Sequence, residues 1–160
     1  MINRDGILRG LTAGVVAAGV MSAARLLAHR AGLLRQTVPQ VVHERVAGET
    51  GFSVLGRTPG HQLAAELMHH GVGAVAGGAL GAVAPRPGAV TGLGYGFLVW
   101  LADHYVVLPA LAVKRGRGRA VDVAAHLVFG AVLAFAMREL ARQPRLQPTP
   151  TEIPLLRHVG

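Results

Sequence analysis

Four long apolar stretches constrain this chain more than any other feature of its sequence. They run over residues 7–28, 62–84, 89–113 and 120–141. An α-helix of about 20 residues crosses the hydrocarbon core of a bilayer, which is roughly 30 Å thick. The sequence therefore predicts an all-α integral membrane protein, in which residues 1–142 form a bundle of four transmembrane helices.

The composition supports this interpretation. Hydrophobic residues make up 51% of the 160 residues and charged residues only 15%, whereas about 25% of the residues in a soluble domain are charged. The mean hydropathy is +0.42 and 22 residues are glycine. Such small side chains suit helices that pack closely in lipid, and the composition argues against a disordered chain or a typical soluble enzyme.

The first stretch can also be interpreted as a cleaved signal peptide, because Asn3-Arg4 precedes an apolar run that ends in small residues. We prefer a retained span, since Arg25 stands where cleavage would have to occur. Arg9 and Arg25 lie near the two ends of this stretch, so their side chains are expected to reach the lipid headgroups.

Two segments lie outside the four stretches. Residues 38–48 carry Pro39 near their start and Gly48 at their end, a pattern that predicts a short interfacial helix in the first loop. Residues 143–160 are rich in proline. They predict an extended, flexible tail without a fold of its own.

The charge and the absence of cysteine narrow the functional classes. The formal net charge is +8, and without cysteine no disulfide, thiolate metal site or cysteine nucleophile is possible. The basic residues stand at the edges of the apolar stretches, with one compact run at Lys114–Arg119. This pattern is typical of headgroup anchors rather than nucleic-acid binding. It predicts the lipid bilayer as the partner and favours a cytoplasmic location for the first and third loops.

Small residues recur every four positions in the apolar stretches, which places them on one face of each helix. Such faces bring membrane helices into close contact, within one chain or between copies in a homo-oligomer. The glycines expected to pack in this way are Gly10, Gly14, Gly73, Gly77, Gly81, Gly88, Gly92, Gly96 and Gly130.

The glycine faces of the last three stretches each continue to a histidine, namely His69, His104 and His126. Since successive spans alternate in direction, all three histidines are expected at a similar depth on the same side of the bundle. Four further polar residues fall in or beside this layer: Glu66, His70, Asp103 and Asp122.

A layer of ionisable groups inside a membrane admits three interpretations. The preferred one is a hydrogen-bonded network in which Glu66 and Asp122 hold the histidines and fix the helix register. The second is a metal or haem site built from His69, His104 and His126 with those acids, because imidazole and carboxylate groups bind transition metals. The third is proton or ion movement in a small transporter or channel, which would have to be oligomeric.

Two other residues, Pro109 and Trp100, lie near the layer. Pro109 lies late in the third stretch, where it removes a helix hydrogen bond to the carbonyl of Tyr105. That carbonyl would complete a polar site, or the proline simply kinks or ends the helix, which we prefer. Trp100 is expected to be a packing residue, one helical turn from His104.

The third and fourth stretches resemble the YagU-like family of bacterial inner-membrane proteins, a family of unknown function. The third matches in Gly92, Trp100 and His104-Tyr-Val-Val-Leu-Pro109, and the fourth in Asp122-Val-Ala-Ala-His126-Leu-Val-Phe129. The His69-His70 pair and the Gly10 and Gly14 pair fit more loosely. The resemblance implies a multi-pass protein of the bacterial inner membrane, with His104, Pro109, Asp122 and His126 as motif positions. It implies no reaction, ligand or transported substrate.

The sequence thus predicts a multi-pass bacterial membrane protein with a buried layer of histidines and carboxylates on one side of the bundle. That layer is expected to be structural or pH-responsive. No pair of a nucleophile and a base and no cofactor loop is recognisable, which argues against an enzyme, although a metal site would reopen the question.

Overall fold

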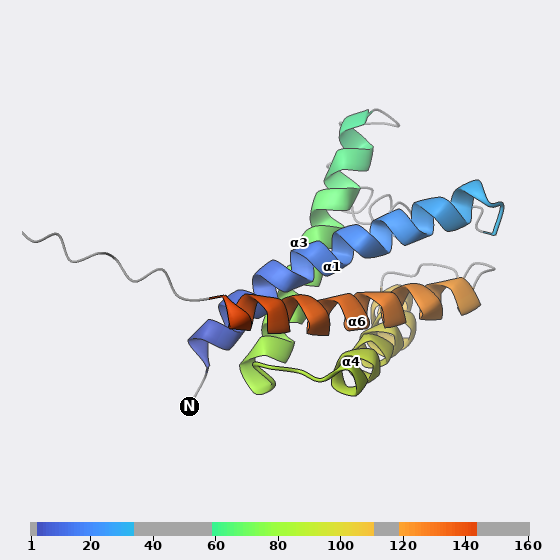
Figure 1. Cartoon of the computed structure of the whole chain (residues 1–160). Coiled ribbons are helices and arrows are strands. Elements are labelled where there is room, and N and C mark those ends of the chain that lie inside the picture. Colours follow the sequence, from blue (N-terminus) through green and yellow to red (C-terminus); the bar gives the residue numbers. More distant parts are fainter. Residues whose placement is uncertain (1–2, 34–58, 111–118, 144–160) are drawn as a thin grey trace, which may run out of the picture.

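The computed structural model describes residues 3–33, 59–110 and 119–143, and the regular structure of these residues is helical throughout (Figure 1). The helices are α1 (Arg4–Arg30), α3 (Pro59–Val83), α4 (Ala89–Ala102), the π-helix η2 (Asp103–Val107), the short α5 (Leu108–Ala110) and α6 (Arg119–Arg142). The predicted all-α fold is confirmed for this part of the chain. The interfacial helix predicted at residues 38–48 and nearly all of the predicted tail lie outside the described residues.

Local signals explain where the helices begin and end. The side chain of Asn3 caps α1 by accepting a hydrogen bond of 2.8 Å from the backbone N–H of Gly6. After α1, Gly32 adopts a φ of 75°, a left-handed conformation that glycine tolerates best. The turn between α3 and α4 holds Pro85 and Pro87, and a proline cannot continue a helix hydrogen-bond ladder.

Three of the described helical segments are long and apolar enough to cross a membrane: Arg4–Arg30 with 27 residues, Ala89–Ala110 with 22 and Arg119–Arg142 with 24. Helix α3 has 25 residues but is not among them. The reason is its composition, since Glu66, His69 and His70 lower the hydropathy of its first half and glycines dilute the second. Of the four predicted spans, the described structure therefore supports three by length and apolarity.

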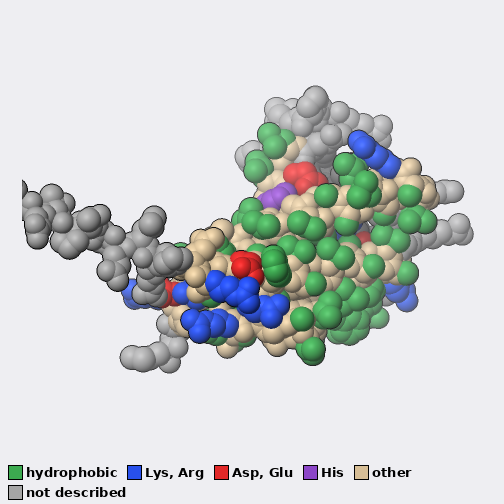
Figure 2. All heavy atoms as spheres, in the orientation of Figure 1, with side chains coloured by type: hydrophobic (Ala, Val, Ile, Leu, Met, Phe, Trp, Pro, Cys, Tyr) green, Lys and Arg blue, Asp and Glu red, His purple; other side chains and the backbone are tan. Residues whose placement is uncertain are grey.

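Large apolar side chains lie on the outside of the bundle. Figure 2 shows them across the visible face of the molecule, and examples on α1 and α4 are Leu8, Val16, Leu27, Val90 and Phe97. A soluble monomer rarely exposes so much contiguous apolar surface. This surface suits a hydrocarbon environment, where side chains face lipid and backbone polar groups pair within helices.

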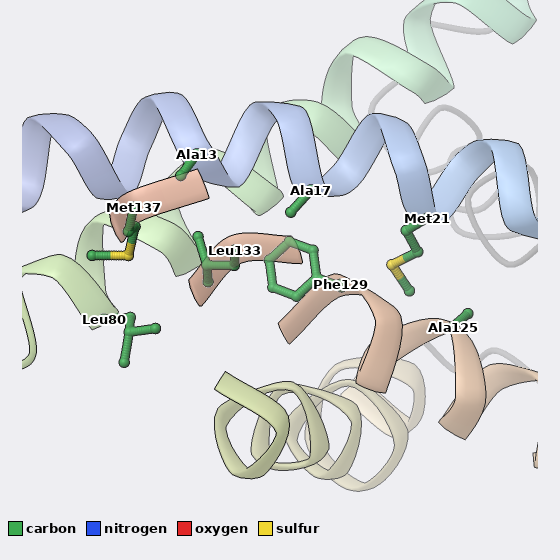
Figure 3. Close-up of a cluster of buried hydrophobic side chains, with 8 residues drawn as sticks. All are labelled: Ala13, Ala17, Met21, Leu80, Ala125, Phe129, Leu133 and Met137. Atoms are coloured by element: carbon green, nitrogen blue, oxygen red, sulfur yellow. The ribbon is translucent and has the colours of Figure 1, made fainter. Parts of the chain in front are cut away.

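Helix α1 holds the bundle together by packing against both α3 and α6, and α6 in turn packs against α4. In Figure 1, α6 runs alongside α1 in the opposite direction, and α3 crosses behind α1. The core between these helices is small and is built from eight residues (Figure 3): Ala13, Ala17, Met21, Leu80, Ala125, Phe129, Leu133 and Met137.

The α1–α3 contact is made directly by glycine backbones. Three pairs face one another along it: Gly6 with Gly81, Gly10 with Gly77, and Gly14 with Gly73. A Cβ atom built on Gly77 would overlap the carbonyl oxygen of Gly10, and one built on Gly10 would overlap that of Gly77. Only glycine allows the two helices to approach this closely.

A second contact of the same kind joins α4 to α6. A Cβ atom on Gly96 would overlap the carbonyl oxygen of His126, and one on Gly130 would overlap that of Gly92. Gly88 was expected to pack in this way and does not, because its nearest neighbour is Thr91 Oγ1 at 4.0 Å. It precedes the first turn of α4 as the N-cap residue.

The glycine faces are therefore engaged within a single chain. The described glycines with open space at the Cβ position are Gly32, Gly71 and Gly94. A homo-oligomer formed through the predicted packing glycines would have to separate helices that already contact one another within the chain. The predicted homo-oligomer therefore stays a prediction that the geometry does not support.

The glycine contact makes a matched pair of substitutions in α3 informative. We expect Gly77→Ala to lower the free energy of unfolding by about 1–3 kcal/mol, because the new methyl group overlaps the backbone of α1. Gly71→Ala adds the same methyl group where nothing lies within 4 Å, so it should leave stability unchanged or raise it by up to about 1 kcal/mol. Denaturant titration of the purified protein in detergent, followed by helical circular dichroism, measures both. Equal losses would contradict the observed packing.

Candidate functional site

Polar side chains from α1, α3, η2 and α6 gather at the end of the bundle where α1 ends and α6 begins. We call this set the polar layer. It consists of Ser22 and Arg25 of α1, Glu66, His69 and His70 of α3, Asp103 and His104 of η2, and Asp122 and His126 of α6.

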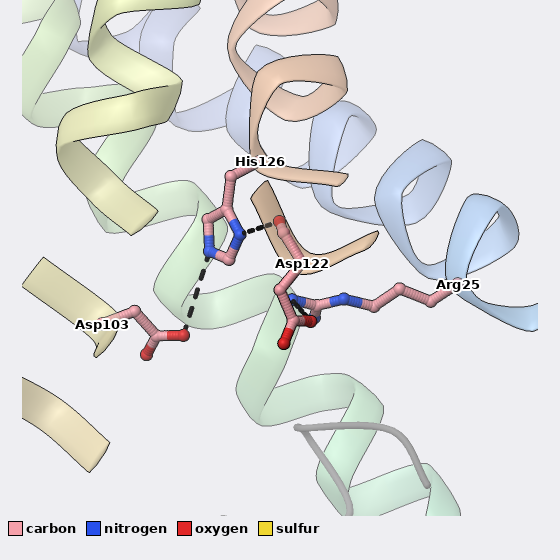
Figure 4. Close-up of polar contacts among 4 residues, drawn as sticks. All are labelled: Arg25, Asp103, Asp122 and His126. Atoms are coloured by element: carbon pink, nitrogen blue, oxygen red, sulfur yellow. Dashed lines mark hydrogen bonds and ion pairs between the residues drawn. The ribbon is translucent and has the colours of Figure 1, made fainter. Parts of the chain in front are cut away.

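Arg25 occupies the interior of the polar layer. Its side chain is only 4% exposed, and its Nη2 lies 3.6 Å from Oδ1 of Asp122 on α6 (Figure 4). The carboxyl groups of Asp103 and Glu66 also attract this guanidinium. One buried cation thus interacts with all three acids of the layer, which come from three different elements.

The prediction that Arg25 reaches the lipid headgroups is wrong. Arg25 follows Ala17 and Met21 at intervals of four and eight residues, so all three residues lie on one face of α1. That face packs against α6, and all three side chains are buried there. The spacing in the sequence could have revealed this, because Arg25 continues a face of small and apolar residues.

His126 connects α6 to η2. Its Nδ1 donates a hydrogen bond of 2.8 Å to the backbone carbonyl of Asp122, and its Nε2 lies 3.8 Å from Oδ2 of Asp103 (Figure 4). With Nδ1 acting as the donor, a neutral His126 presents a lone pair at Nε2. A protonated His126 presents an N–H group there instead and forms an ion pair with Asp103.

The π-helix brings two successive residues into the layer. Asp103 extends to His126, while His104 is buried and stacks on Trp100 with ring centroids 5.1 Å apart. The backbone N–H of Leu108 bonds to the carbonyl of Asp103, one residue further back than in an α-helix. The wider turn changes which side chains lie on the same face of the helix. Such π-turns occur often at functional sites.

Pro109 lies outside the polar layer, in the last described turn of the helix. The helix continues through it to Ala110, and Pro109 itself is exposed. Because proline has no N–H group to donate to the residue four positions earlier, the π-turn directly before it replaces the regular α-helical ladder. A widened turn is thus observed directly before Pro109, and the expected kink or helix end stays a prediction. Trp100 is buried as a packing residue, as predicted.

A second set of contacts joins α3 to α1 within the layer. The hydroxyl of Ser22 donates a hydrogen bond of 2.8 Å to Oε2 of Glu66, and a hydrogen bond joins the ring of His69 to the backbone of Ala18. His70 donates from Nδ1 to the carbonyl of Glu66 at 2.8 Å. Ser22 was not predicted as a member of the layer, since serine is common in membrane helices and its spacing gives no distinctive signal.

Comparisons of the chain with protein-family models, with curated proteins and with solved structures find no match. The resemblance to the YagU-like family therefore depends on the residues quoted for it in the third and fourth stretches.

The predicted metal ligands share the layer without forming a metal site. Within the described residues, no group of three or more His, Asp or Glu side chains is placed to hold a metal ion. His69, His104 and His126 instead bond to, or stack against, separate neighbours. The metal or haem interpretation stays a prediction that the geometry does not support.

The described helices pack closely between the polar layer and the other end of the bundle. The interior between these described helices consists of glycine contacts and of apolar side chains such as Phe129, Leu133 and Met137. One polar link crosses it, from the hydroxyl of Tyr95 to the carbonyl of Ala76 at 2.6 Å. Such close packing of the described helices does not favour a channel through a single copy of the chain.

Several buried polar atoms of this region make no hydrogen bond with the described residues. They are Nε of Arg25, Nε2 of His69, Nε2 of His104 and Nε1 of Trp100. A buried polar atom without a partner is costly, about 1–3 kcal/mol. These nitrogen atoms of the polar layer and of Trp100 can therefore form hydrogen bonds in addition to those observed.

The ion pair between α1 and α6 can be tested by a double-mutant cycle. Arg25→Met leaves the carboxylates without their cation and should lower the free energy of unfolding by about 3–5 kcal/mol. Asp122→Asn should also be destabilising, and the Arg25→Met/Asp122→Asn variant should lose less than the sum of the two, by about 0.5–3 kcal/mol. Denaturant unfolding in detergent measures all three variants.

The matched control is Arg30→Met, which removes an exposed arginine from the same helix and should change stability by less than about 0.5 kcal/mol. Strictly additive effects of the Arg25 and Asp122 substitutions would contradict a direct interaction between them.

Proposed function

We propose that this chain is a multi-pass protein of the bacterial plasma membrane, and a member of the YagU-like family, whose polar layer holds the helices in register and binds protons. The observation that carries this proposal is the buried Arg25–Asp122 ion pair between α1 and α6. Around this pair, carboxyl groups outnumber permanent cations.

Membrane insertion is supported by three apolar helices and by the apolar side chains on the outside of the bundle. We assign α3 as the fourth span. Its glycines contact α1 from Gly6 to Gly14, and its polar residues Glu66 and His69 bond to α1. These bonds lower the cost of placing polar groups inside a bilayer.

The charge balance of the polar layer requires protons. Three carboxyl groups (Glu66, Asp103 and Asp122) accompany one guanidinium (Arg25), and three negative charges minus one positive charge leave an excess of two when all are ionised. Such an excess is unfavourable in an environment of low dielectric constant. Binding of protons by the carboxyl groups restores neutrality.

Proton binding is linked to helix packing because the titratable groups bridge different elements. His126 of α6 contacts Asp103 of η2, and Glu66 of α3 contacts Ser22 of α1. A change in the protonation of these groups alters the interactions between the helices that carry them. This arrangement makes the stability of the bundle respond to pH.

The proposal predicts the sign of the pH dependence. A carboxyl group that keeps its proton in the folded layer and loses it in the unfolded chain makes the free energy of unfolding fall as the pH rises, by up to about 1.4 kcal/mol per pH unit. Replacing Asp103 by asparagine removes this loss, so the thermal unfolding midpoint of Asp103→Asn in detergent, relative to that of the parent chain, should be higher at about pH 8 than at about pH 5. Circular dichroism or intrinsic Trp100 fluorescence measures the midpoint.

A pair of acid-to-amide variants tests whether the polar layer is responsible. Asp103→Asn removes one excess carboxyl group and should change the pH dependence in this direction, whereas Asp5→Asn, at the opposite end of α1, should preserve that of the parent. An unchanged pH dependence in Asp103→Asn, or the same change in Asp5→Asn, would overturn the proposal.

A further inference from the structure

A second polar feature lies at the end of the bundle opposite the polar layer, where α1 begins and α3 is followed by α4. It is a pocket of about 480 Å³, lined by Asn3, Asp5, Arg9, Ala84, Pro85 and Arg86. The start of α1 and the α3–α4 turn pack closely there, because a Cβ atom on Gly6 would lie 3.0 Å from the Cβ of Pro85. The pocket is thus formed by two separate segments that the fold holds together.

Two guanidinium groups border this pocket, one from each segment. Arg9 of α1 lies 4.0 Å from Asp5, at the outer limit of an ion pair, and therefore keeps N–H groups for another acceptor. Arg86 in the turn is exposed and forms no ion pair with a described residue. The amide group of Asn3 adds a donor, since only its carbonyl oxygen is used to cap Gly6.

The whole of this end of the bundle is basic. The described arginines here are Arg4, Arg9, Arg86, Arg138 and Arg142, and the acids are Asp5 and Glu139. Glu139 already pairs with Arg142. Figure 2 shows the basic side chains gathered at this end of the molecule. Their combined field attracts an anion to the pocket.

Exposed apolar side chains belong to the same segments as the residues that line the pocket, or follow them directly in the sequence. Val83 at the end of α3 is 81% exposed, Val90 in the first turn of α4 is 84% exposed and Leu8 of α1 is 61% exposed. Guanidinium groups beside exposed apolar surface match a ligand that is anionic at one end and apolar at the other. An inorganic anion would use only the guanidinium groups.

We propose that this pocket binds the phosphate of an anionic phospholipid, with the acyl chains lying along the exposed apolar side chains. Arg9 and Arg86 contact the phosphate oxygens, and Asn3 donates a further hydrogen bond. The inference rests on the proposed location in a membrane, because headgroup phosphates lie at the level where transmembrane helices begin and end.

The test uses the full chain in detergent micelles at a fixed pH near 7, so that its outcome is independent of the pH response of the polar layer. Phosphatidylglycerol, phosphatidylcholine or inorganic phosphate is added, and binding is followed by the shift of the thermal unfolding midpoint and by native mass spectrometry. We expect phosphatidylglycerol to bind more tightly than phosphatidylcholine. Arg86→Gln should weaken phosphatidylglycerol binding about fivefold.

Arg30→Gln is the matched control, since Arg30 is an exposed arginine at the other end of α1. It should retain the affinity of the parent chain. Equal weakening in Arg30→Gln, or equal binding of the two lipids, would overturn the proposal. Competition by inorganic phosphate at equal concentration would assign the pocket to free phosphate and would likewise overturn a lipid ligand.

Discussion

The Arg25 guanidinium is buried inside a bundle whose exterior is apolar, and a buried cation must be neutralised by groups that the fold supplies. Asp122 provides the nearest carboxylate at 3.6 Å, and Asp103 and Glu66 add to the attraction. These acids come from α6, η2 and α3. The need to neutralise the buried Arg25 guanidinium therefore determines how α6, η2 and α3 are arranged around α1.

The glycine contacts make that arrangement possible. Helices α1 and α3 approach until their backbones touch at Gly10 and Gly77, and α4 and α6 do so at Gly92 and Gly130. Close approach shortens the distance that polar side chains must span at the end of the bundle. It also leaves a small core, so the stability of the fold depends on helix contacts and on the polar layer more than on the burial of large side chains.

The two ends of the bundle differ in chemistry. The polar layer contains an excess of carboxyl groups and binds protons in our proposal, whereas the other end is basic and forms a pocket around Arg9 and Arg86. Glycine contacts and apolar side chains separate the two ends within the described helices. The two proposed ligands, an anion at one end and protons at the other, thus belong to different surfaces of the bundle.

The sequence predicts the helices and most of the polar layer, because spacing of four residues identifies which residues share a helix face. It does not predict which helices contact each other. Each long helix carries a similar glycine face, and the sequence alone does not show which of these faces pair. Ser22 was missed because serine is common in membrane helices. The role of Arg25 was missed because a position near the end of a span also suits a headgroup anchor, although its spacing places it on the buried face of Ala17 and Met21. The π-turn at Asp103 was missed because Pro109 indicates only that a hydrogen bond is lost, and several backbone geometries accommodate that loss.

The direct test of the central claim is the distance between Arg25 and Asp122 in a bilayer. Solid-state NMR of protein labelled with ¹⁵N-arginine and ¹³C-aspartate, reconstituted in lipid, detects carboxyl carbons close to guanidinium nitrogens. The account predicts such a signal for Asp122, consistent with 3.6 Å between Nη2 and Oδ1. This signal should disappear in Arg25→Met, while the signal from Asp5 and Arg9 persists. An Asp122 signal that is absent, or unchanged in Arg25→Met, would contradict a bundle organised around the buried guanidinium.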